Sequence, residues 1–84
     1  MHKMLDDKTV QERLSANILH FLSMHKMTQQ QLARKTGETD MFVSRIVRKI
    51  HIPNVAAMSR IAEALDVSVD QLLAEPSRKF SKTA

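Results

Sequence analysis

Apolar residues recur along the 84-residue chain at intervals of three and four, the spacing of one buried face of an α-helix. No window alternates between apolar and polar residues convincingly enough to predict a β-strand. Five such stripes, separated by short polar breaks, therefore predict an all-α fold. They comprise Val10, Leu14, Ile18, Phe21 and Leu22; Leu32 and Ala33; Val43 and Ile46, with Val47 or Ile50; Met58, Ile61, Ala62 and Leu65; and Leu72 and Leu73.

Each predicted helix begins at a side chain that can cap free backbone amides. The first begins near Asp7 or Thr9, where Thr9 and Glu12 have the spacing of a capping box. The remaining signals are capping boxes at Thr28–Gln31 and Ser68–Gln71, single caps at Thr39 and Asn54, and breaks at Gly37, Pro53 and Pro76.

These boundaries predict one domain over residues 7–76, with an N-terminal arm at 1–6 and a flexible basic tail at 77–84. The chain has no cysteine, so neither a disulfide nor a thiolate metal site can brace the fold. With three Phe and no Trp or Tyr, the core must be aliphatic. The longest mostly apolar stretch, residues 18–24, is too short to span a bilayer, and the first residues lack a secretory core. We therefore expect a cytoplasmic protein with no membrane association.

Charge is distributed unevenly along the chain, whose net charge is +4. Residues 26–60 contain seven basic and two acidic side chains, whereas residues 61–75 contain four acidic side chains and no basic one. The pattern predicts one basic face followed by an acidic segment. At this charge excess, a basic face that is simply solvated is as good an interpretation as one that binds nucleic acid.

The single glycine separates two short amphipathic stretches. Ala33 is small enough to let two helices approach closely, and Gly37, four residues later, can adopt the positive φ of a tight turn. Leu32, Val43 and Ile46 can then close over the angle between the helices. This is the spacing of a helix-turn-helix, whose second helix fits the major groove of DNA.

The sequence resembles the Cro and phage-repressor family over roughly residues 9–73. It has Gln29, Leu32-Ala33, Gly37 and Val43-Ser44 at the family's usual places, and after Pro53 the run IAEALDVSVDQLL resembles the closing two helices. The resemblance implies a compact five-helix, lambda-repressor-like DNA-binding domain.

Four positions depart from that family's pattern. Glu38 stands at a usually apolar position of the turn, and Val47 and Lys49 stand where Glu and Gly are typical. Asp66 replaces a usual Gly, which is tolerable if the residue has positive φ because Asp adopts that conformation more readily than most residues.

Mapped onto this chain, the resemblance implies contacts with double-stranded DNA from the start of the third helix. Contacts to base edges would come from Asp40, Met41 and Arg45, and contacts to the DNA backbone from Gln29, Thr39, Phe42, Arg48 and Lys49.

Several of these assignments have an alternative. Asp40 either accepts a hydrogen bond from a cytosine or only stabilises the helix N-terminus, where the macrodipole favours acidic residues. Met41 is either a contact to DNA or packing filler. Phe42 either packs on sugar or a thymine methyl, or folds back onto the protein. Arg45 reads a guanine or contacts phosphate alone.

The sequence gives no support to an enzyme, a cofactor or a metal centre. The four histidines do not have metal-ligand spacing, and one glycine cannot build a phosphate-binding loop. We therefore expect a homodimeric regulator of transcription, most simply a repressor on a two-fold-symmetric operator. The interface would lie at the fifth helix, through Val69, Leu72 and Leu73. The alternative is an antitoxin or another protein-interaction module that binds a protein partner through residues 77–84.

Overall fold

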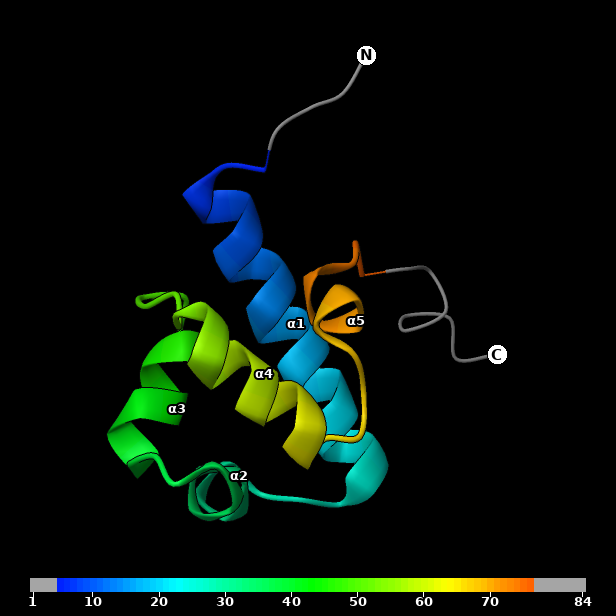
Figure 1. Cartoon of the computed structure of the whole chain (residues 1–84). Coiled ribbons are helices and arrows are strands. Elements are labelled where there is room, and N and C mark those ends of the chain that lie inside the picture. The colour runs from blue at the N-terminus through cyan, green and yellow to red at the C-terminus, as the bar shows by residue number, and fades with distance from the viewer. Residues whose placement is uncertain (1–4, 77–84) are drawn as a thin grey trace.

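The fold consists of five helices in the computed structural model, which describes residues 5–76 (Figure 1). They are α1 (Asp7–His25), α2 (Gln29–Thr36), α3 (Asp40–Val47), α4 (Val55–Ala64) and α5 (Val69–Leu73). The long α1 packs against α3 and α5, α2 packs against α3 and α4, and α4 also contacts α5. No strand occurs within residues 5–76, so the predicted all-α fold is confirmed.

The core is aliphatic, as predicted, and every helix contributes to it. Leu14, Ile18, Leu32, Leu65 and Leu72 are completely buried. The predicted stripe positions are confirmed as buried or half-buried, and of the two alternatives at the end of the third stripe, Val47 packs against the core whereas Ile50 is 58% exposed. None of the described helices is long and apolar enough to cross a bilayer.

Side-chain caps fix four helix starts where the sequence predicted them. Thr28 and Ser68 form complete capping boxes with Gln31 and Gln71, and Thr39 and Asn54 each accept a hydrogen bond from an amide three residues on. These caps satisfy amides that would otherwise lack a partner at a helix N-terminus.

The predicted capping box at the start of α1 is wrong. Asp6 is the N-cap, and its carboxylate accepts a hydrogen bond from the Thr9 amide at 2.8 Å. That bond to the backbone lowers the pKa of Asp6 below its usual value. The helix therefore begins at Asp7, and Asp6 belongs functionally to the helix although it falls within the predicted arm. Residues 1–4 of that arm and the predicted tail, 77–84, lie outside the described residues.

Polar side chains of α1 hold the short α5 in place. Asn17 is 1% exposed and donates hydrogen bonds to the carbonyls of Leu72 and Ala74 at 2.7 and 2.8 Å. Arg13 donates to the carbonyl of Leu73 at 3.2 Å. A helix of five residues is too short to be stable alone, so these bonds and the burial of Leu72 stabilise it.

Candidate nucleic-acid interface

The corner between α2 and α3 is built as a tight helix-turn-helix. Leu32 and Ala33 of α2 and Val43 and Ile46 of α3 are each 0–1% exposed, so they meet inside the angle between the helices. Gly37 ends α2 with φ 76°, a conformation that costs glycine little. The structural roles predicted for these five residues are thus consistent with where they lie.

An ion pair and a backbone hydrogen bond at Glu38 also stabilise the turn, and the sequence pattern did not indicate the ion pair. Glu38, half-buried, accepts a hydrogen bond from the Arg60 guanidinium of α4 at 2.9 Å, and its amide bonds to the carbonyl of Ala33 at 2.9 Å. The ion pair is partly exposed and therefore contributes at most about 1 kcal/mol. It explains how a charged residue fits where the family pattern favours an apolar one.

The outward face of α3 contains the three residues predicted to contact base edges. Asp40, Met41 and Arg45 are all exposed, and Met41 is 56% exposed. Met41 and Arg45 are four residues apart and therefore lie on the same side of the helix. Val43 and Ile46 face the core on the opposite side of the helix. The side that contains Met41 and Arg45 is therefore open to a ligand.

Phe42 lies closer to the protein than the other predicted contact residues. It is half-buried, packs against the core, and makes an edge-on contact with His51, with ring centroids 5.3 Å apart. Of the two arrangements open at the sequence level, the structure has the one in which Phe42 folds back. The ring thereby links α3 to the loop that follows it.

The remaining predicted backbone contacts lie at or next to the ends of α2 and α3. Gln29 is the first residue of α2, and Thr39 accepts the Phe42 amide at 3.0 Å through its hydroxyl oxygen. Arg48 and Lys49 are exposed where α3 ends, and Lys49 has φ 66°. Lys49 thus occupies a left-handed position where the family commonly has Gly, and Asp66, with φ 59°, does so at the other Gly position.

The predicted interface residues at α5 do not all lie on the surface. Leu72 is completely buried in the core of its own chain, so its proposed part in an intermolecular contact is wrong. Val69 and Leu73 are half-buried and pack partly against the same core. The apolar pattern of α5 therefore mainly reflects its docking on α1.

Comparison with known proteins identifies a family and a similar solved structure. Residues 24–72, more than half of the chain, match the model of a helix-turn-helix family. The structure is similar to the crystal structure of the hypothetical transcription factor NHTF from Neisseria, with a TM-score of 0.80 and 26% sequence identity over 96% of this chain and 93% of that chain. No curated protein matches the sequence. The matched region contains both helices of the turn and their core, and the chain belongs to the helix-turn-helix family of Cro and the phage repressors.

Proposed function

We propose that the protein is a sequence-specific, DNA-binding regulator of transcription, most simply a repressor that occludes a promoter. The observation that carries this proposal is the exposed face of α3, where Met41 and Arg45 project from a helix whose opposite side is locked into the core. An α-helix presented in this way fits the major groove of B-DNA.

Arg45 supplies the chemistry for base recognition. Its planar guanidinium can donate two parallel hydrogen bonds to O6 and N7 of a guanine, a pairing that a lysine ammonium does not match. Asp40 has the opposite charge and repels phosphate, so its use in recognition is limited to accepting a hydrogen bond from a cytosine amino group. Met41 offers an apolar contact to a thymine methyl.

Residues at the ends of α2 and α3 supply contacts to phosphate. Arg48 and Lys49 are exposed cations at the end of α3. The Thr39 oxygen already accepts the Phe42 amide, but its hydroxyl hydrogen remains able to bond a phosphate oxygen. Gln29 stands at the start of α2, where free amides also favour an anion. Such contacts fix the orientation of α3 without reading sequence.

The regulator acts as a homodimer in this proposal, because one recognition helix provides few base contacts. Two copies related by a two-fold axis would bind half-sites about 10 base pairs apart, centre to centre. The alternative function, binding of a protein partner, depends on residues 77–84, which lie outside the described residues.

Salt dependence of DNA affinity tests the proposal against that alternative. A protein that neutralises phosphates releases counterions, so its affinity for duplex DNA should fall steeply as salt rises from about 50 to 200 mM. Fluorescence anisotropy with labelled duplexes measures this. Absence of binding at the low-salt end, or an affinity independent of salt, would exclude a DNA-binding regulator.

A further inference from the structure

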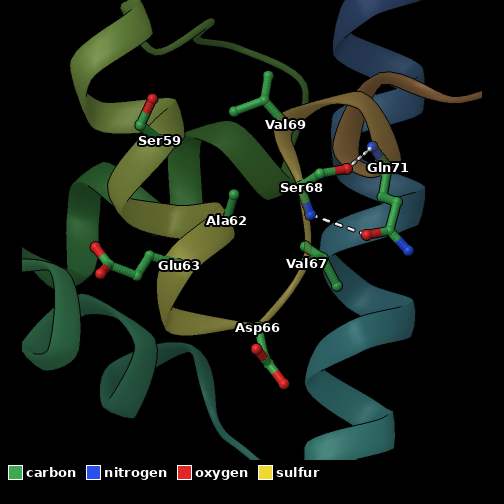
Figure 2. Close-up of a pocket in the computed structure, with 8 residues that line it drawn as sticks. All are labelled: Ser59, Ala62, Glu63, Asp66, Val67, Ser68, Val69 and Gln71. Atoms are coloured by element: carbon green, nitrogen blue, oxygen red, sulfur yellow. Dashed lines mark hydrogen bonds between the residues drawn. The ribbon is translucent and has the colours of Figure 1, made fainter.

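A band of three adjoining grooves crosses the outer sides of α2, α4 and α5. One groove, of about 660 Å³, lies between the end of α4 and the start of α5 and includes Glu63 and Asp66 (Figure 2). Another, of about 360 Å³, lies where α1 meets α2 and includes Lys26, Arg34 and Lys35. A third, of about 310 Å³, shares Lys35 with the second and Glu63 with the first, so it lies between them.

The two ends of this band have opposite charge. Glu63 and Asp66 form the acidic end, and Lys26, Arg34 and Lys35 form the basic end; all five are exposed. Within residues 5–76 the Arg60–Glu38 pair is the one ion pair, so none of the five has an opposite charge bound to it there. In Figure 2 the dashed bonds join Ser68 to Gln71 and leave both carboxylates unbonded.

A surface with this polarity is complementary to itself. If a second copy is turned by a two-fold axis, the acidic end of each chain lies over the basic end of the other, and both contacts form at once. DNA or an anionic membrane would be repelled by the acidic end, and a uniformly charged peptide would match only one end. We therefore propose that a second copy of this chain docks on the band, an inference that rests on the proposed homodimer and names its contact surface.

Apolar side chains within the same grooves add to the contact. Met27, Ala64, Val67 and Val69 are half-buried and line the grooves between the charged residues. No residue of α3 lines any of the three grooves, so docking here leaves the recognition helix accessible. Because each chain has a net charge of +4, the attraction is local and works against an overall repulsion.

Charge reversal at each end of the band tests this inference. Sedimentation equilibrium of the full chain without DNA should show dimers that dissociate more readily at about 500 mM salt than at about 50 mM. Arg34→Glu leaves one net positive charge at the basic end, and Glu63→Lys leaves the acidic end without net charge, so either variant alone should dimerise about tenfold more weakly or worse. An equimolar mixture of the two variants should favour the heterodimer over either homodimer, because the unchanged acidic end of one variant then faces the unchanged basic end of the other.

Matched controls separate this effect from net charge. Lys8→Glu and Glu12→Lys make the same charge changes at exposed positions of α1 outside the band, and both should dimerise like the unchanged protein. If the band variants dimerise as well as these controls, or if their mixture forms no heterodimer, the docking surface is wrong while the homodimer stands. If the unchanged protein is a monomer at every salt concentration, the docking surface and the homodimer are both wrong. The DNA affinity of the same samples tests separately whether the protein is a DNA-binding regulator.

Discussion

Arg45 and Arg48 are three residues apart in sequence but occupy different positions relative to the recognition helix. Arg45 lies within α3, one turn after Met41, whereas Arg48 is the residue at which the helix ends, with φ −84°. Both are exposed, so replacing either with Ala should leave the core intact. The two arginines therefore allow base reading and phosphate contact to be measured separately.

Arg45→Ala should cost about 1–3 kcal/mol of binding free energy on the preferred DNA site and relax the preference at one base pair in each half-site, because a bidentate contact to guanine is lost. Arg48→Ala should weaken binding to all sequences nearly equally and make the salt dependence less steep. Affinities for a series of duplexes changed at single positions measure both effects. A uniform loss of affinity with Arg45→Ala would show that Arg45 contacts phosphate alone.

At the residue scale, the sequence could place side chains on a face but could not resolve their contacts. The helical period put Asp40, Met41 and Arg45 outside the buried stripe, and all three are exposed. The same period put Phe42 outside the stripe as well, and its packing against the core and its contact with His51, in a loop with no repeating pattern, were not evident from that period. Recognition roles for the exposed residues stay predictions.

The turn between α2 and α3 depends on two small residues for different reasons. Gly37 needs its φ of 76°, and an added Cβ would meet nothing within 4 Å, so substitution there strains the backbone without a clash. Ala33 has ordinary helical geometry but is 1% exposed, so substitution there overfills the core.

Gly37→Val should lower the free energy of unfolding by about 1–3 kcal/mol, because a β-branched residue is strained at positive φ. Gly37→Asn is the matched control and should lose much less, because Asn adopts this conformation more readily. Thermal unfolding followed by circular dichroism gives the comparison. Equal stability of the Val and Asn variants would mean that the left-handed turn does not form.

Ala33→Leu should also cost about 1–3 kcal/mol of stability, here by forcing α2 and α3 apart. The variant should lose DNA affinity together with stability, since the two helices are expected to contact DNA as a unit. Ala56→Leu, at an exposed position of α4, controls for the larger side chain. Unchanged unfolding temperatures for Ala33→Leu would place the helix contact elsewhere.

At the element scale, local signals predicted most of the fold. Caps at Thr28, Thr39, Asn54 and Ser68 act over three residues, so the sequence displays both partners. The start of α1 was ambiguous because Asp6 and Thr9 are both good caps. Contacts such as Asn17 to Leu72, which are 55 residues apart, leave no local pattern and were not foreseen.

For the whole molecule, acidic and basic residues that are separate in the sequence come to lie near each other on the folded surface. Glu63 and Asp66 of the acidic segment and Arg34 and Lys35 of α2 line adjoining grooves that include no residue of α3. The sequence pattern showed a basic and an acidic segment but could not show that residues from both lie on the same surface. Likewise, the apolar residues of α5 suggested an interface, whereas Leu72 completes the core of its own chain.

Selection of bound duplexes from random-sequence DNA tests the central claim most directly. If α3 reads base edges in a symmetric dimer, the selected sequences should share an inverted repeat whose half-sites lie about 10 base pairs apart, with a guanine position that becomes variable when the selection is repeated with Arg45→Ala. Bound pools that remain random in sequence would contradict sequence-specific recognition, and a single half-site without a repeat would contradict the symmetric dimer.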